Sequence, residues 1–245
     1  MASRSESLWR HPLLEGLAVL VAILIAFGLE AWWQERSERV AERVYLEALS
    51  GELEDARSFF VTQDQALDAD MDLAQAVRDA LNSDSALSIS DDSVNVLVLQ
   101  LRPVSVQAPP RAALDDLISS GGIGLVQSDV LRRAVASYVQ ALESDSRTQD
   151  ATVDHWLTHL APYRYSHSTV NIEVPLAPSA NLPVTIDRDA YVRDRYYANL
   201  LSARVLRTAD VRTSHHSALE KLDRLLGLLH VMGINSAKQT PPNNP

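Results

Sequence analysis

The feature that most constrains this chain is an apolar run near its start, LLEGLAVLVAILIAFGLEAWW, which occupies Leu13 to Trp33. As an α-helix these 21 residues would reach about 31 Å, which matches the hydrocarbon thickness of a bilayer. The fourteen residues between Glu15 and Glu30 carry no charge, and tryptophans flank both ends, where interfacial aromatic belts lie. We predict a single transmembrane helix over residues 13–33.

Two other interpretations of this run are a buried core helix and a cleaved signal peptide. A buried helix of a soluble core would not need tryptophans at both ends, although a charge-free stretch of fourteen residues is short for a membrane span. A cleaved signal peptide would be followed by small residues at the cleavage site, whereas here the chain continues with Glu30-Ala31-Trp32-Trp33. Retention of the helix as an anchor is the interpretation that fits best.

The orientation of the anchor is not decided by charge, because Arg4 and Arg10 precede the helix while Arg36, Arg39 and Arg43 follow it. A short tail inside with the large domain translocated is the usual outcome for an uncleaved helix near the N-terminus. We therefore expect a single-pass protein of the cell membrane, with a cytoplasmic N-terminus and an extracytoplasmic domain.

Composition points to an acidic, helical domain. The formal charge is −10, and since residues 1–33 contribute two arginines and three glutamates, the remainder carries −9. Nucleic acid is therefore not an expected partner. The absence of cysteine excludes thiolate metal sites and disulfides. Helix-favouring alanine and leucine abound, while glycine occurs only eight times.

The helix is predicted to continue past the anchor to about Leu81, where Asn82, Ser83 and Asp84 end it. One side of this helix alternates in steps of three and four, as in a coiled coil or bundle seam. Its members are Leu46, Leu49, Leu53, Ala56, Phe60, Gln63, Leu67, Asp70, Ala74, Val77 and Leu81.

Shorter segments follow. Ser90 is expected to cap SVNVLVLQL, which periodicity leaves open between helix and strand and which we predict to be helical. RAALDDLISS should be a helix that ends at the glycines of SSGGIG. Ser128 or Asp129 should cap the next helix, and Pro162 should end it. Residues 162–183 read as a long proline-rich loop with a small hairpin. Asp187 should cap a last helix that runs to about Met232.

Together these elements predict an all-α fold in which one N-terminal transmembrane helix continues into an antiparallel helical bundle with a long proline-rich loop excursion. The expected organisation is an N-terminal tail over residues 1–12, the membrane helix over 13–33, a helical soluble domain over 34–233 and a disordered tail over 234–245.

Two stretches carry a resemblance to a family. The first is Leu14-Glu15 followed by Ile23-Leu24-Ile25-Ala26, Trp32 and Glu35-Arg36; the second is Leu117-Ile118-Ser119-Ser120-Gly121, then Leu125, Leu131-Arg132 and Tyr138. They resemble an uncharacterised family of bacterial single-span membrane proteins with an N-terminal anchor and a helical domain of unknown function. The resemblance implies fold and anchoring, with Ser119, Ser120, Gly121, Leu131 and Arg132 as a family-like turn, and it implies no known activity.

No motif favours catalysis. His155 and His159 lie four apart, as two zinc ligands on a helix would, but no local carboxylate supplies a third ligand, so ordinary half-buried histidines are the simpler interpretation. SSGGIGLV lacks the Gly-Lys-Ser/Thr of a phosphate loop and is better explained as a turn between helices. We therefore predict no catalytic residues, no metal site and no cofactor.

The last helix has an apolar seam whose centre is polar, at Thr208, Arg212 and His215. If this helix lies antiparallel to the first with Asp187 near Leu81, Arg212 falls level with about Ser58, within two turns of Gln63. A polar bundle layer of Gln63, Thr208, Arg212 and His215 is the resulting prediction. Such a layer could fix helix register or line a pocket for a small ligand.

The expected function is a membrane-anchored non-enzymatic helical module that binds or organises other envelope proteins. An alternative is a membrane-anchored ligand-sensing helical bundle, and an enzyme of unknown class is a third. The expected partners are the lipid bilayer and other membrane or envelope proteins, with homo-oligomerisation through the membrane-proximal helix left open.

Overall fold

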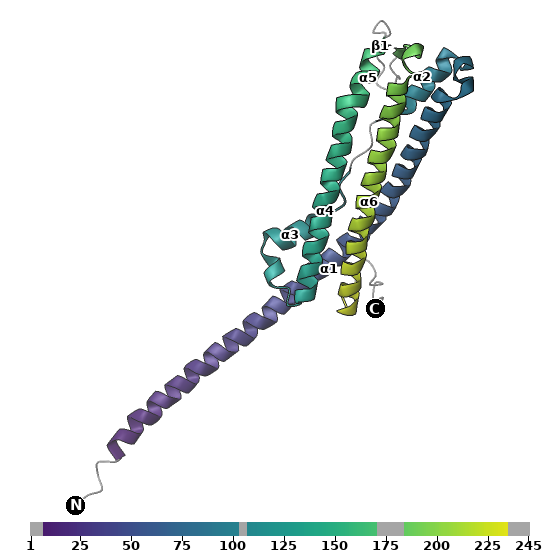
Figure 1. The fold of residues 1–245 in the computed structure, drawn as a ribbon. Coiled ribbons are helices and arrows are strands. Elements are labelled where there is room, and N and C mark those ends of the chain that lie inside the picture. The colour runs from purple at the N-terminus through teal and green to yellow at the C-terminus, as the bar shows by residue number, and fades with distance from the viewer. Residues whose placement is uncertain (1–6, 103–106, 171–183, 235–245) are drawn as a thin grey trace, which may run out of the picture.

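The longest element is helix α1, Ser7–Asn82, which runs for 76 residues without interruption. The structure is a computed structural model that describes residues 7–102, 107–170 and 184–234, with the backbone alone for residues 7–16, 18 and 170. At the usual rise of an α-helix, α1 is about 114 Å long. Its N-terminal half projects from the bundle, and its C-terminal half is one of the bundle's long helices (Figure 1).

The predicted membrane helix lies on the projecting half of α1. Within the described part of the chain, no helix combines the length and the apolar character that a bilayer crossing requires, so the prediction has no support there. Residues 13–16 and Ala18 belong to the predicted span, and their side chains lie outside the description. The described side chains from Leu17 to Trp33 are all exposed.

Burial on α1 begins at Leu46 and follows the predicted seam. Leu46, Leu49 and Leu53 are almost fully buried, and the burial continues in steps of three, four and seven through Ala56, Phe60, Leu67, Ala74, Val77 and Leu81. Val40 and Val44 stand six and two residues before Leu46, out of step with the seam, and both are exposed. The seam prediction is therefore confirmed, and α1 ends one residue after the predicted Leu81.

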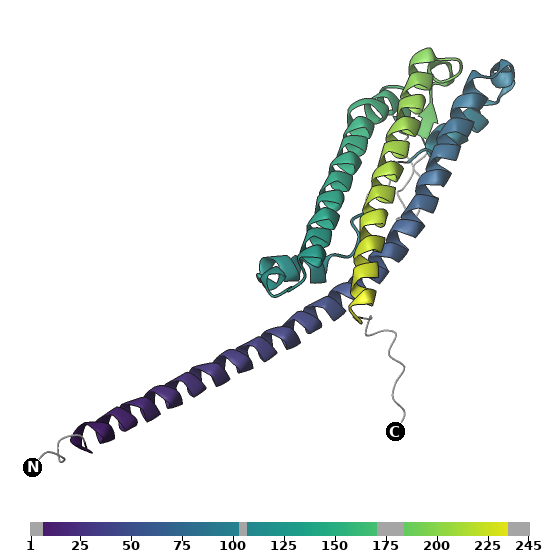
Figure 2. The same ribbon diagram turned by 60° about the horizontal axis from the view of Figure 1, so that its bottom comes forward.

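Helix α6, Arg195–Val231, is the central helix of the bundle and packs along both α1 and α4, Asp129–His155. It runs antiparallel to both, and α1 and α4 run in the same direction (Figures 1 and 2). The prediction of an all-α bundle is confirmed. The bundle has three long helices, because the described part of the chain between α1 and α4 forms only short helices and 3₁₀ turns.

That return begins with a 3₁₀ turn, Asp84–Ser88, and α2, Asp91–Gln100. The segment predicted as helix is thus helical, and the Ser90 side chain accepts from the Ser93 N–H at 3.3 Å, as a helix cap does. Helix α3, Ala112–Ser119, follows a described segment without helix or strand over residues 107–111. Pro109 and Pro110 disfavour helix here, since proline lacks the backbone donor and restricts the residue before it.

The start of α3 is held by α1. The Glu52 carboxylate accepts hydrogen bonds from the N–H groups of Ala113 and Leu114, at 2.6 and 3.0 Å. A carboxylate at this end of a helix satisfies its free N–H groups and complements the positive end of the helix dipole. The 3₁₀ turn Gly122–Gly124 follows α3, and Ser128 then caps α4 as predicted, accepting from the Leu131 N–H at 3.3 Å.

Beyond α4 the helix does not stop at Pro162 as predicted. It widens into a π-helical turn, Trp156–Leu160, and continues as α5, Ala161–Ser166. Pro162 stands in the first turn of α5, where a missing backbone N–H costs little. The strands β1, Ser168–Val170, and β2, Val184–Ile186, form the expected small antiparallel hairpin, whose connection over 171–183 lies outside the described residues.

Helix α6 begins seven residues later than predicted. Asp187 caps only a 3₁₀ turn, Arg188–Ala190, whereas Asp194 caps α6 by accepting from the Tyr197 N–H at 2.6 Å. The turn between them is fixed to the end of α1, because the Arg193 N–H donates to the Leu81 carbonyl at 3.0 Å. The late start shifts the whole helix along α1.

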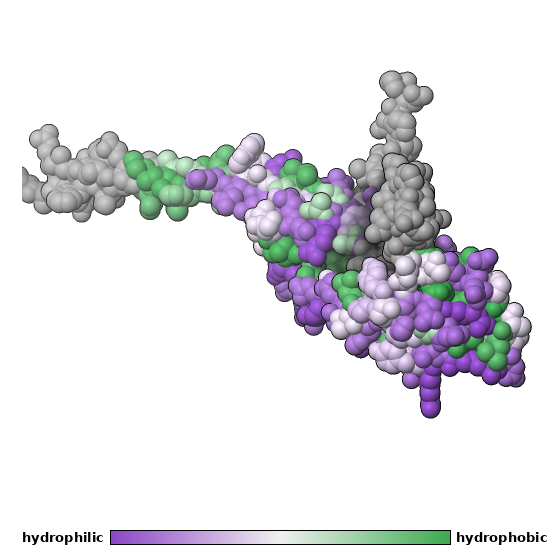
Figure 3. All heavy atoms as spheres, turned by 90° about the horizontal axis from the view of Figure 1, so that it is seen from above, coloured by the Kyte–Doolittle hydropathy of each residue, from purple (hydrophilic) through white to green (hydrophobic). Residues whose placement is uncertain are grey.

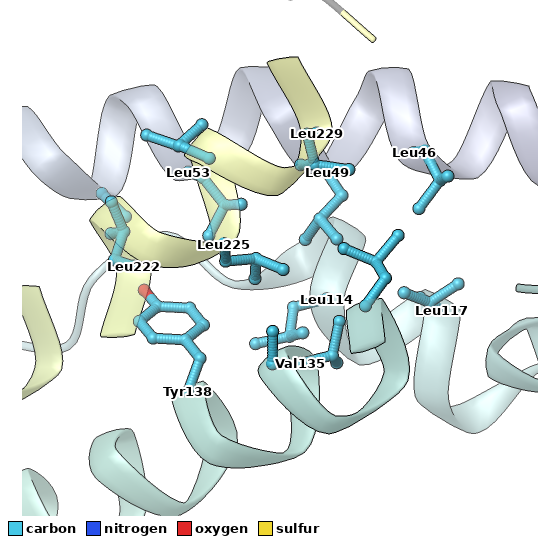
Figure 4. Packing of buried hydrophobic residues seen from close by; sticks show 14 of the residues in the cluster. Leu46, Leu49, Leu53, Leu114, Leu117, Val135, Tyr138, Leu222, Leu225 and Leu229 are labelled. Atoms are coloured by element: carbon cyan, nitrogen blue, oxygen red, sulfur yellow. The ribbon is translucent and has the colours of Figure 1, made fainter. Parts of the chain in front are cut away.

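Two hydrophobic cores hold the bundle. The proximal core lies at the end from which α1 projects, and Figure 4 shows its leucines from α1, α3 and α6 around Val135 and Tyr138 of α4. The distal core lies at the other end. It contains Ala74, Val77, Leu81, Ala86, Val94, Val98, Leu101, Trp156, Leu160, Ala161, Tyr191, Val192, Tyr197, Leu200 and Leu201.

The distal core predicts how the protein responds to alkaline pH. Burial raises the pKa of Tyr191 to about 12, and its hydroxyl has no hydrogen-bond partner among the described residues. The pKa of Tyr191 is therefore higher in the folded chain than its value of about 10 in the unfolded chain. As a result, the contribution of Tyr191 to the free energy of unfolding is complete below pH ~10 and is lost as the pH rises toward 12. Tyr191→Phe should therefore weaken the loss of stability above pH ~10 without lowering stability at pH 7.

Urea unfolding of the full chain at pH 7 and between pH ~9 and 11 measures this effect. Tyr165→Phe is the matched control, because Tyr165 is exposed, and it should leave the pH dependence as in the parent. An unchanged alkaline slope in Tyr191→Phe would contradict the assignment.

Candidate functional site

A band of polar side chains separates the two hydrophobic cores. Most of its members are buried, although polar groups rarely are unless they are hydrogen-bonded or paired. We call this band the polar layer. It consists of Asp64 and Asp70 of α1, Asp145, Gln149 and Thr152 of α4, and Arg204, Thr208 and His215 of α6.

Arg204 forms the first centre of the layer. Its side chain is 2% exposed, and it binds both carboxylate oxygens of Asp70, one of them through Nε at 3.2 Å. The Thr208 hydroxyl also donates to Asp70, at 3.3 Å. Arg204 Nη2 donates to the Arg102 carbonyl at 2.6 Å, and the guanidinium lies 5.0 Å from the Trp156 ring centre. One side chain thus joins α6 to α1, to the backbone at Arg102 and to the π-helical turn.

His215 forms the second centre, 4% exposed between carboxylates of two helices. Its Nδ1 lies 3.2 Å from Asp64 Oδ1, and its Nε2 lies 3.6 Å from Asp145 Oδ2. Gln149 Nε2 lies 3.3 Å from His215 Nε2 and 2.6 Å from Asp145 Oδ2. The imidazole thus contacts Asp64 of α1 on one side and Gln149 and Asp145 of α4 on the other.

The geometry of this centre does not form a nucleophile. Ser214 donates its hydroxyl to Asp145 instead of to His215, so the serine and the imidazole are not arranged as nucleophile and base. Within the described residues, no group of three or more histidine, aspartate or glutamate side chains is placed to hold a metal ion. What the layer does is join α1, α4 and α6 at one fixed register.

The four residues of the predicted polar bundle layer differ in how deeply the structure buries them. Thr208 and His215 are buried in the layer. Gln63 is half-buried and donates to Gln107 at 3.4 Å. Arg212 lies at the edge, 42% exposed, and pairs with Asp68 at 3.0 Å. Asp68 stands ten residues beyond Ser58 in the sequence, which corrects the predicted register and follows from the late start of α6.

The residues that the prediction missed carry a recognisable signal. Leu201, Arg204 and Thr208 keep the three-four spacing of the α6 seam, so Arg204 is the charged member of an otherwise inward-facing row. On α4 the same spacing runs through Leu142, Asp145, Gln149 and Thr152, all buried. A charged residue at a seam position of one helix, together with a charged residue at a seam position of another, is therefore the sequence signal for the Arg204 and His215 centres.

The family-like turn joins α3 to α4. Ser119 is the last residue of α3, and Ser120 ends it with a hydroxyl that donates to the Asp116 carbonyl at 2.6 Å. Gly121 has a φ of 77°, which glycine adopts without strain. Leu131 is fully buried in the proximal core, and the Arg132 guanidinium bonds a backbone carbonyl of the preceding loop.

His155 and His159 lie together at the end of α4 and in the π-helical turn, with ring centres 5.1 Å apart. Burial, followed by the neighbouring His159, lowers the pKa of His155. The pair is not part of a metal-binding group among the described residues.

Comparison of the chain with protein families, with curated proteins and with solved structures found no match. The resemblance to the uncharacterised family of single-span membrane proteins therefore stays a prediction.

The Arg204–Asp70 pair generates a prediction about stability. Arg204→Met should lower the free energy of unfolding by about 3–5 kcal/mol, because it leaves the largely buried Asp70 carboxylate without its partner. The double variant Arg204→Met/Asp70→Leu should recover at least half of that loss, since neither charge is then left unpaired.

Urea unfolding of the full chain in mild detergent gives these free energies. Arg212→Ala is the control, because it removes an exposed pair with Asp68 that should contribute about 0–1 kcal/mol. Equal costs for Arg204→Met and Arg212→Ala, or a double variant as unstable as the sum of its singles, would show that the pair is not the centre of the layer.

Proposed function

We propose that this chain is a membrane-anchored, non-enzymatic helical module that binds or organises other envelope proteins. The observation that carries the proposal is the continuity of α1, which joins an exposed apolar stretch to the bundle without a break. In this proposal the bilayer covers the apolar stretch, and the bundle presents its surface to partners.

The projecting half of α1 supports membrane anchoring by its exposed surface. Leu20, Leu24, Phe27 and Leu29 are each more than half exposed, and Figure 3 shows the hydrophobic side chains gathered on this part of the molecule. A contiguous apolar surface of this kind marks a site that contacts a membrane or another protein.

The residues that follow change in character, as expected at a membrane surface. Trp32 and Trp33 are exposed, and the Arg36 guanidinium lies 5.9 Å from the Trp32 ring centre. Ion pairs between side chains four residues apart then begin, as in Arg43–Glu47 at 2.8 Å. Aromatic side chains followed by paired charges suit the passage from headgroups to water.

The bundle supports a binding or organising role instead of a catalytic one. Its buried polar residues are used to join helices, and its described residues offer no metal-binding group. The part of the chain beyond residue 33 carries a formal charge of −9, which favours basic surfaces on partner proteins.

Anchoring is tested by inserting charge into the apolar stretch. The parent chain, reconstituted into phosphatidylcholine vesicles, should float with them and resist extraction at alkaline pH. Leu20→Arg/Leu24→Arg should be extracted, because each arginine at the centre of a membrane helix costs about 2.5–3.5 kcal/mol.

The matched control is Leu206→Arg, which adds a charge at an exposed leucine of the bundle and should float like the parent. Circular dichroism checks that all three chains remain helical. Complete extraction of the parent chain, or flotation of Leu20→Arg/Leu24→Arg, would refute anchoring through this stretch.

The proposed orientation has the N-terminus in the cytoplasm and the bundle outside it. A reporter that is active only outside the cytoplasm, fused after Pro245, should therefore work, and one that is active only inside should not. Activity of the inside reporter alone would reverse the orientation and direct the search for partners to the cytoplasm.

A further inference from the structure

A pocket of about 200 Å³ lies between α4 and α6, near the end of the bundle from which α1 projects. Val130, in its wall, belongs to the first turn of α4, and Arg224 stands seven residues before the end of α6. The remaining wall residues are Arg133, Ala134, Ser137 and Lys221.

This pocket concentrates positive charge in an acidic protein. Three of its six lining side chains are cations, and none is a carboxylate, although the chain carries a net charge of −10. Within the described part of the chain, Arg133 and Arg224 form no ion pair, and Lys221 pairs only with the adjacent Glu220, at 3.0 Å. The positive charges in the pocket repel one another, and a bound anion relieves this repulsion.

The nearby carboxylates are held elsewhere. Asp223, next to Arg224, is bound by Arg57 of α1 at 2.8 Å. Asp129, one turn before Arg133, is bound by Arg132. Arg133 and Arg224 are thus left to a ligand, whereas Lys221 is paired with Glu220.

We infer that this pocket binds a phosphate group. Arginine and lysine side chains are the usual protein ligands for phosphate, and the Ser137 hydroxyl in the same wall adds a donor. A doubly charged anion is attracted by the three cations that line one pocket between two helices.

The phosphate has two possible sources, which share this chemistry. It can be the headgroup phosphate of an anionic lipid, which rests on the proposed membrane anchoring, or it can be a soluble phosphate. The pocket lies near the end of the bundle from which α1 projects, which is the end nearest to the proposed membrane. The binding site itself does not depend on anchoring.

The test is a thermal-unfolding titration of the full chain in neutral detergent. One arm adds inorganic phosphate, a second adds short-chain phosphatidic acid, and a third adds short-chain phosphatidylcholine, all with chloride adjusted to equal ionic strength. A ligand that binds only the folded chain raises Tm with its concentration. Inorganic phosphate should raise Tm, and phosphatidic acid should do so more strongly if the lipid is the natural source.

Arg133→Gln/Arg224→Gln should weaken phosphate affinity at least tenfold, because it removes two of the three charges and keeps the side chains polar. The control is Arg207→Ala, in a second groove between α4 and α6, where Asp210 lies 3.9 Å from the guanidinium. It should bind phosphate like the parent. If the double variant does not fold, Arg224→Gln alone serves, with a smaller loss expected.

No rise in Tm with either inorganic phosphate or phosphatidic acid, or equal rises in the parent and Arg133→Gln/Arg224→Gln, would overturn the site. A rise with inorganic phosphate alone supports the site and assigns a soluble source. Since the titration is made in detergent, phosphate binding can succeed where vesicle anchoring fails, and the two proposals are separated.

Discussion

The rest of the fold depends on one constraint, the uninterrupted course of α1. A single helix supplies both the projecting apolar surface and one wall of each hydrophobic core, so α6 packs along it only from Leu46 onward. Because α1 and α4 run in the same direction, the chain has to return between them, and this return also contributes the Arg102 carbonyl to the polar layer.

The polar layer sets the position of α6 along this framework. Leucine seams alone allow a helix to slip by a turn with little loss, whereas a buried charge accepts only the register in which its partner faces it. Arg204 with Asp70, and His215 with Asp64 and Asp145, fix α6 against both neighbours at once. Burial of such groups costs solvation, so the layer stabilises one arrangement of the helices more than it stabilises the folded state as a whole.

Much of this architecture could be predicted from local signals. The α1 seam, the Ser90 and Ser128 caps and the left-handed Gly121 follow from spacing and cap chemistry. The start of α6 could not be predicted in this way, because Asp187 and Asp194 are equally good caps and the choice between them depends on a long-range bond between Arg193 and Leu81. That choice moved Arg212 to the edge and left Arg204 as the buried cation, so the layer was predicted in kind but not in all its members.

The function proposed here joins two regions of one helix: an apolar stretch in a bilayer and a bundle held in register outside it. The chain has no cysteine, so single cysteines carrying nitroxide labels can be introduced one at a time from Leu17 to Glu47. In vesicles these labels report most directly which α1 residues lie in the bilayer. The account predicts that labels at 17–29 collide more with dissolved oxygen than with a water-soluble nickel chelate, and that the preference reverses from Gln34 onward. Preference for the nickel chelate throughout the scan would contradict it.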